Sequence, residues 1–217
     1  MAYAIKAIPT TYAGVNFRSR LEARWAAFFD LCGWKWDYEP FDLDGWAPDF
    51  LLKGKIKALV EVKPVDFRGP DRQLYAQALA HGAKAFGVSI PRKDGALPEY
   101  EALVIGNGPF KGDRWSLGVF AAPRRDWGEI ERELHSQHIN DPTFGCDVAD
   151  LYCGRSATLD YAARYGNYQY RIGGEYDGDS HLHQIGDDTP EKLWREAGNI
   201  VQWKPDNSNR RRRRRAA

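Results

Sequence analysis

The chain has 217 residues, 43% of them hydrophobic and 13% aromatic, which is enough to bury the core of one large or two small domains. No stretch approaches the roughly 18 apolar residues of a membrane span, and the first residues lack the layout of a secretory signal. Three irregularly spaced cysteines are too few for a disulfide framework, so we expect a soluble, cytoplasmic protein that makes no membrane contact.

A run of six arginines makes the charge distribution uneven. The whole chain carries 31 basic and 30 acidic residues, but without this run 25 basic residues face 30 acidic ones. The body of the protein is therefore mildly acidic and is not coated for nucleic acid. The run can hold a phosphate backbone by salt-sensitive attraction, or it can be a solvated tail or a fused purification tag. It consists of Arg210, Arg211, Arg212, Arg213, Arg214 and Arg215.

An amphipathic helix is predicted near the N-terminus. Apolar residues recur there at helical spacing, and Gly33 follows them as a helix-ending glycine should. The stripe predicts a helix from Phe17 to Cys32 with one buried face. Its members are Phe17, Leu21, Trp25, Phe28, Phe29 and Cys32.

Short strands and a second helix are predicted after this helix. Alternating or continuous apolar runs, bounded by turn residues, indicate the strands, and a turn at 53–55 joins the second strand to the third. The resulting α-β-β-β-α-β order predicts an α/β fold with helices packed on a mixed sheet. The predicted strands are 34–39, 48–52, 58–63, 85–90, 103–105 and 116–120, and the second helix is 74–82.

The sequence changes in character near residue 123. Residues 144–188 are rich in Gly, Asp and Tyr and alternate weakly, which favours short twisted hairpins. A closing helix is predicted at 190–197, with Thr189 as its N-cap and Gly198 past its end.

These patterns divide the chain into three parts. We expect a core at 1–123, an accessory β-rich module with the closing helix at 124–205, and a disordered Arg-rich tail at 206–217. The accessory module is expected to position the substrate, and it is also where a homodimer or a partner protein would attach.

Two carboxylates and an amine are predicted to meet at one end of the first hairpin. Asp49 lies at the outer end of one strand of the hairpin. Glu61 and Lys63 lie two residues apart on the other strand, so both of their side chains project from the same face. Carboxylate oxygens are the ligands that Mg²⁺ prefers, and Mn²⁺ is the alternative ion. A water on such an ion is a natural nucleophile for a phosphodiester, and the adjacent lysine can orient it or stabilise the developing charge.

Glu22 is the third acidic candidate. It lies on the predicted first helix beside Leu21 and Trp25, so we expect it at the edge of the core. Arg18 is one turn earlier on the same face, and it is a candidate contact for nucleic acid.

The sequence resembles the PD-(D/E)XK nucleases, which have the restriction-endonuclease-like fold. The resemblance covers the first half of the chain and is closest to the compact branch common in phages and mobile elements. It implies that Glu22, Asp49 and Glu61 bind the metal ion, that Lys63 is the catalytic lysine, and that the substrate is DNA. The matching segments are Arg-Ser-x-x-Glu-x-x-x-Ala from Arg18, Tyr38-Glu-Pro40, Pro48-Asp49 and Glu61-Val-Lys63.

Each of these residues also has a purely structural interpretation. Glu22 would complete a capping box with Ser19 if the helix began there, although the apolar stripe starts earlier. Asp49 could be a turn residue, and Glu61 and Lys63 could form a solvent-facing pair on an amphipathic strand. The spacing of all of them together favours the nuclease site.

Zinc is the other metal for which the sequence contains potential ligands. Cys146, Cys153, His181 and His183 are zinc-type side chains, but the cysteines are too far apart for a compact zinc knuckle. We interpret these residues as buried thiols and surface histidines, and the alternative is a zinc module that has lost some of its ligands.

The alternative to an enzyme is a catalytically inactive nuclease-fold module that binds nucleic acid or a partner protein. Eight tryptophans and eleven tyrosines leave aromatic side chains available for base stacking or for a protein interface. Because all four catalytic-type residues are present, we favour a Mg²⁺-dependent deoxyribonuclease. Its resemblance to the phage branch suggests a phage-encoded protein.

Overall fold

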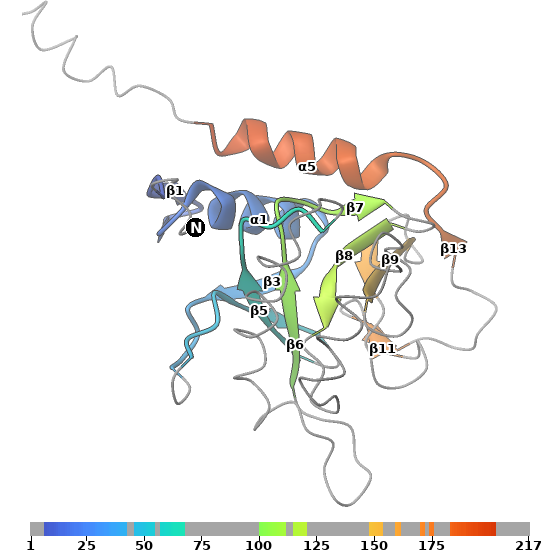
Figure 1. Ribbon diagram of the computed structural model, residues 1–217, viewed down its shortest axis with the longest axis horizontal. Coiled ribbons are helices and arrows are strands. Elements are labelled where there is room, and N and C mark those ends of the chain that lie inside the picture. The colour runs from blue at the N-terminus through green and yellow to red at the C-terminus, as the bar shows by residue number, and fades with distance from the viewer. Residues whose placement is uncertain are drawn as a thin grey trace, which may run out of the picture.

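The computed structural model describes ten parts of the chain, and the predictions at 74–82, 85–90 and 206–217 lie outside them. In the described parts, two helices lie on the same side of a large sheet, so the protein has a mixed α/β fold (Figure 1). Neither of these helices, at 12 residues each, has the length that a membrane span requires. The described residues are 7–42, 46–54, 57–67, 100–111, 115–120, 148–153, 159–161, 170–171, 174–175 and 183–202.

The described elements are short strands and two helices. Every described strand has six residues or fewer, and the helices lie near the two ends of the described chain. In chain order they are β1 (Thr10–Tyr12), β2 (Val15–Phe17), α1 (Arg20–Leu31), β3 (Lys35–Tyr38), β4 (Phe50–Lys53), β5 (Lys57–Val62), β6 (Tyr100–Ile105), β7 (Phe110–Lys111), β8 (Trp115–Phe120), β9 (Val148–Cys153), β10 (Leu159–Tyr161), β11 (Tyr170–Arg171), β12 (Gly174–Glu175), β13 (His183–Gln184) and α5 (Thr189–Ile200).

Nine of the described strands form one mixed sheet. Its main path is β10-β9-β8-β6-β5-β4-β3, with β13 paired to β9 and β7 paired to β8. The β5–β6 pair is parallel and the other pairs are antiparallel. The strands β9, β10 and β13 come after residue 123, so the described residues on both sides of the predicted boundary share one sheet.

The first helix begins later than the apolar stripe predicts. Ala13 and Gly14, with φ of 50° and 80°, form a two-residue turn that pairs β1 with β2. Phe17 is therefore the last residue of β2, and Ser19 is the N-cap of α1. The predicted start at Phe17 is wrong, but its side chain still reaches the core, where it is 1% exposed.

The end of α1 confirms the prediction for Gly33. This glycine has a φ of 74°, and its amide donates to the Asp30 carbonyl at 3.0 Å. The next amide, of Trp34, donates to the Phe29 carbonyl at 2.8 Å. These two bonds make a Schellman motif, in which a left-handed glycine ends the helix.

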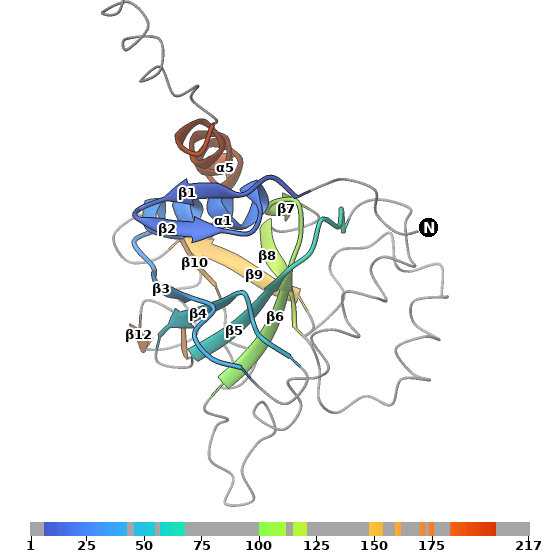
Figure 2. The same ribbon diagram turned by 90° about the vertical axis from the view of Figure 1, so that its left-hand side faces the viewer.

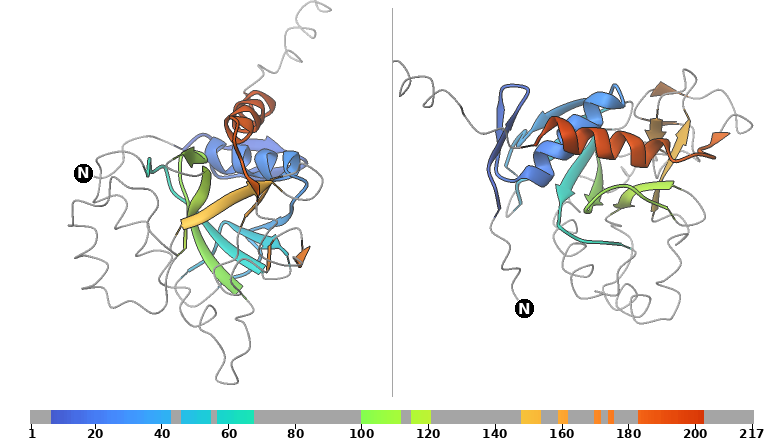
Figure 3. Two further views of the ribbon diagram at one scale, coloured as in Figure 1. Left: turned by 90° about the vertical axis from the view of Figure 1, so that its right-hand side faces the viewer. Right: turned by 90° about the horizontal axis from the view of Figure 1, so that it is seen from above.

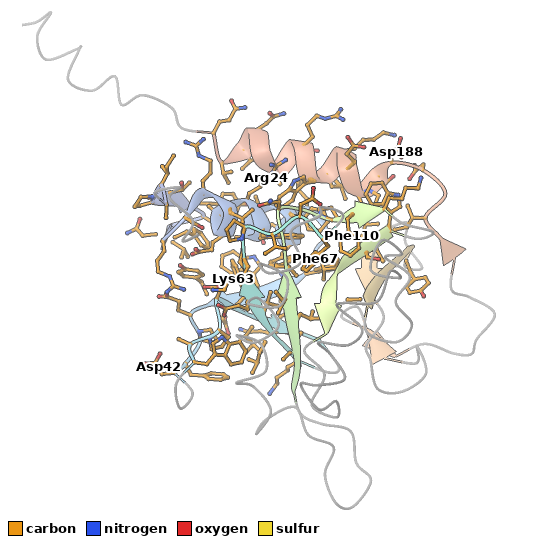
Figure 4. The ribbon with its side chains drawn as sticks, viewed as in Figure 1. Arg24, Asp42, Lys63, Phe67, Phe110 and Asp188 are labelled. Atoms are coloured by element: carbon orange, nitrogen blue, oxygen red, sulfur yellow. The ribbon has the colours of Figure 1, made fainter. Side chains whose placement is uncertain are left out.

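The last helix, α5, is longer than predicted. Its N-cap is Asp188, not Thr189, and Gly198 lies inside the helix. A Cβ at Gly198 would meet the Arg24 guanidinium at 3.0 Å. The Arg24 side chain lies between α1 and α5 (Figure 4). Its guanidinium donates to the Trp194 carbonyl at 2.8 and 3.0 Å and lies over the Trp194 ring. Gly198 therefore makes room for a side chain of α1.

The main core lies between the sheet and the two helices (Figures 2 and 3). Residues from both ends of the chain build it: Trp25 of α1 packs against Trp194 of α5 with ring centroids 4.5 Å apart and the rings tilted by 46°. The Trp34 indole also donates to the Leu159 carbonyl of β10 at 2.9 Å. The strands β9 and β10 and the helix α5 are therefore part of the same core as α1.

A smaller cluster lies on the opposite face of the sheet. It joins Leu51 of β4, Leu59 of β5 and Ala102 of β6 to Trp46, which precedes β4, with Phe41 packed against them. Because side chains alternate along a strand, this is also the face onto which Glu61 projects.

Candidate active site

The β4–β5 hairpin brings Asp49 and Glu61 together. Phe50 pairs with Val60 in the antiparallel register, so continuing the register by one residue sets Asp49 opposite Glu61. Each residue is 4% exposed. The Asp49 Oδ2 atom accepts the Val62 backbone amide at 2.7 Å, which fixes this carboxylate to the end of β5.

Glu61 is held by a cation and an indole. Its Oε1 lies 2.5 Å from the Lys63 ammonium, and its Oε2 accepts the Trp46 indole N–H at 2.6 Å. Lys63 follows β5 (Figure 4). Its amide donates to the Ile105 carbonyl at 2.9 Å. Its side chain is 30% exposed, so the ammonium is within reach of a ligand in solvent.

Glu22 approaches the same place from the first turn of α1. Its Oε1 accepts the Ser19 hydroxyl at 2.6 Å, and its Oε2 accepts the Tyr38 hydroxyl at 2.5 Å. The Glu22 amide donates to Ser19 Oγ at 3.2 Å, as in a capping box. Burial, followed by the hydrogen bond to Glu22, raises the pKa of Tyr38 to about 12, so this hydroxyl stays protonated.

Arg18 connects these acidic residues. Its Nη2 lies 2.5 Å from Asp49 Oδ1, and its Nε lies 2.9 Å from Glu39 and 4.0 Å from Glu22 Oε2. Its backbone amide donates to the Tyr38 hydroxyl at 3.1 Å. The side chain is 58% exposed, so one guanidinium joins a buried carboxylate to the surface.

The cluster has more negative than positive charge. The carboxylates of Glu22, Asp49 and Glu61 face the two cations Arg18 and Lys63. Burial, and next the nearby Glu61 carboxylate, raise the pKa of Asp49 to about 7, with a further contribution from Glu22. The Val62 amide and the Arg18 guanidinium oppose this rise without cancelling it. Asp49 is therefore a carboxylate with too little counter-charge around it.

The structure thus brings together the four predicted residues, Glu22, Asp49, Glu61 and Lys63. The capping interpretation of Glu22 is correct in part, because the helix begins at Arg20 and Ser19 caps it through the Glu22 amide, while the Glu22 carboxylate accepts the Ser19 hydroxyl. Glu61 does not belong to a solvent-facing pair, since it is almost fully buried. Glu22 therefore combines a capping contact with a place beside the other carboxylates.

The donor set of this cluster suits a hard divalent cation. Three carboxylates with excess negative charge offer the all-oxygen ligands that Mg²⁺ and Mn²⁺ bind. In the ranges that the structure describes, however, no group of three or more His, Cys, Asp or Glu side chains stands ready to hold a metal. Protein donors occupy the carboxylate oxygens of Glu22, Asp49 and Glu61, so a cation would have to replace some of these contacts.

Sequence reasoning did not find the polar side chains that orient the carboxylates. Trp46 lies in a turn-rich segment without periodicity, and Tyr38 is expected only as part of the strand 34–39 and of the matching Tyr-Glu-Pro segment. A tryptophan just before the Pro48-Asp49 dipeptide was the available signal. A buried indole N–H needs a hydrogen-bond acceptor, and Glu61 provides one for Trp46.

The zinc-type residues are only partly described. Cys153 of β9 and His183 of β13 stand at paired positions of the antiparallel register. Cys146 and His181, like the run from Arg210 to Arg215, lie outside the described residues.

Comparison with known proteins adds no identity to this geometry. No family model, no curated protein and no solved structure matches the chain.

Proposed function

We propose that the chain is a divalent-metal-dependent nuclease with a restriction-endonuclease-like core of the PD-(D/E)XK type, which hydrolyses DNA phosphodiester bonds. The observation that supports this proposal is the meeting of Asp49, Glu61 and Lys63 at adjoining strand ends, with Glu22 beside them. The choice of DNA rests on the sequence resemblance.

The roles of the residues follow from their surroundings. Glu22, Asp49 and Glu61 would supply the oxygen ligands of a Mg²⁺ or Mn²⁺ ion. Such an ion would neutralise charge on the scissile phosphate and lower the pKa of the attacking water. The Lys63 ammonium, which is partly exposed, would orient that water or stabilise charge on the phosphate. Trp46 and Tyr38 hold Glu61 and Glu22 in fixed orientations.

Incubation with supercoiled, linear and single-stranded DNA, and with RNA, tests this function in Mg²⁺, in Mn²⁺ and in EDTA. We expect cleavage of DNA only with a divalent ion, and none with Asp49→Ala or Glu61→Ala. Lys63→Ala should slow cleavage by about 10²–10³-fold while it retains Mn²⁺ binding, as loss of a charge-stabilising group does.

The matched control is Asp37→Ala. Asp37 lies on β3, is 46% exposed and pairs with Lys53, so its loss removes a carboxylate outside the cluster. This variant should cleave at the wild-type rate. Full activity of the Asp49→Ala, Glu61→Ala double variant would rule out the proposed mechanism.

The second candidate is an inactive module that binds nucleic acid or a protein. It is favoured by the protein donors on both oxygens of Glu22, Asp49 and Glu61, because an ion-pair network of this kind needs no metal. If this candidate is correct, no ion supports cleavage, and EDTA leaves DNA or partner binding unchanged.

A further inference from the structure

The contacts of Asp49 indicate which of its oxygens a cation could use. Oδ2 accepts the Val62 amide, a backbone contact that can open only if the strand end moves. Oδ1 is bound by the guanidinium of Arg18, a long side chain that is 58% exposed. The Arg18 contact is therefore the one that can open without a change in the sheet.

Arg18 also has a second acidic neighbour that would keep it close after such an opening. Its Nε lies 2.9 Å from Glu39, whose side chain is 45% exposed and does not belong to the buried cluster. A guanidinium released from Asp49 would stay at the mouth of the site. Its planar fork of N–H donors fits the oxygens of a phosphate.

We propose that in the metal-free protein the Arg18 guanidinium occupies the position of the divalent cation beside Asp49. The binding cation displaces this guanidinium from Asp49, and the guanidinium then binds a phosphate of the substrate. This inference rests on the proposed function, because it requires a cation and a phosphate-bearing ligand at this site. Beyond that function, the inference states that a divalent cation replaces the Arg18 guanidinium at Asp49.

The exchange makes a defined prediction for binding. In the metal-free protein Arg18 is engaged by Asp49 and contributes little to DNA affinity. With the cation present, the same side chain contributes a charge-assisted bond to phosphate. Because coupling between two ligands is reciprocal, DNA must then also tighten cation binding.

Titration with Mn²⁺ at pH 8.5, by calorimetry or by the spin resonance of the free ion, tests the displacement. Arg18→Met, with Arg18→Gln as a second variant, should bind Mn²⁺ about tenfold more tightly than the wild type, a factor that corresponds to about 1.4 kcal/mol. The control is Arg195→Met, which removes an equal charge from an exposed pair with Glu191 on α5, and should change the affinity less than twofold.

Binding to a short fluorescent duplex, in EDTA and in Ca²⁺, tests the release. We expect Arg18→Met to match the wild type in EDTA and to bind about tenfold more weakly in Ca²⁺, the loss expected for one charge-assisted bond. An equal loss in both conditions would overturn the exchange.

The two kinds of failure can be told apart by the wild type and Asp49→Asn. If the wild type binds Mn²⁺ and Asp49→Asn does not, the proposed metal site is supported. Unchanged or weaker Mn²⁺ binding by both Arg18 variants would then overturn the exchange without overturning the metal site. If wild type and Asp49→Asn bind Mn²⁺ equally, the metal site itself is wrong, and the exchange is refuted with it.

Discussion

Replacing Asp49 with Asn should change how the stability of the metal-free protein depends on pH. In the folded protein the pKa of Asp49 rises from its ordinary value of 3.8 to about 7, first through burial and then through Glu61. Between these two values the folded state binds more protons than the unfolded state. The free energy of unfolding must therefore fall as the pH rises through this range.

The size of this effect follows from the shift. A rise from 3.8 to about 7 corresponds to about 4 kcal/mol of stability that Asp49 removes once it is ionised. Asn cannot ionise, so Asp49→Asn should resemble the wild type near pH 4 and should be more stable at pH 8. The shift is a net value that already includes the favourable contact of the carboxylate with Arg18, so the expected gain is about 4 kcal/mol.

Urea unfolding in EDTA from pH 4 to pH 8.5 measures the effect as the difference between the two proteins. Subtraction removes the titration of groups that both share. Asp37→Asn is the control, because Asp37 is half-exposed and paired with Lys53 at the surface. If the profiles of wild type and Asp49→Asn run parallel across this range, Asp49 is not the destabilised carboxyl that its surroundings imply.

Two further perturbations test the packing and the tail. Gly106→Ala should cost about 3 kcal/mol in a denaturation experiment, because its Cβ would lie 2.3 Å from the Val65 carbonyl oxygen; Gly186→Ala, with open space around it, should change stability by less than about 0.5 kcal/mol. Deletion of 210–217 should weaken DNA binding at low salt and flatten its salt dependence, since each neutralised phosphate releases about 0.9 counterion. Equal salt slopes with and without the arginine run would show that it contributes nothing.

The sequence predicts the local elements of the first half well because their signals are local. The strands β3, β4, β5 and their order after α1 follow from alternation and turn residues, and they carry Asp49, Glu61 and Lys63 to one place. The start of α1 is predicted too early because of the position of Phe17. Phe17 packs where a helical residue would pack, so its spacing alone does not reveal that it comes from a hairpin strand.

Contacts between distant parts of the chain could not be predicted in this way. Gly198 looks like a helix end, and only the Arg24 side chain crossing α5 explains why the helix continues through it. The same holds for Trp46, whose bond to Glu61 depends on how a turn folds back over the sheet. Periodicity reports which face of an element is buried, and it does not report what covers that face.

The contact between Arg24 and Trp194 spans 170 residues of sequence, which has a consequence for protein synthesis. At about 5–20 residues per second, α5 leaves the ribosome roughly 10–30 s after α1. During that interval Trp25 lacks Trp194, and the helix that carries Glu22 is only partly covered. The packing of α1 against α5 can therefore be completed only after translation has passed α5.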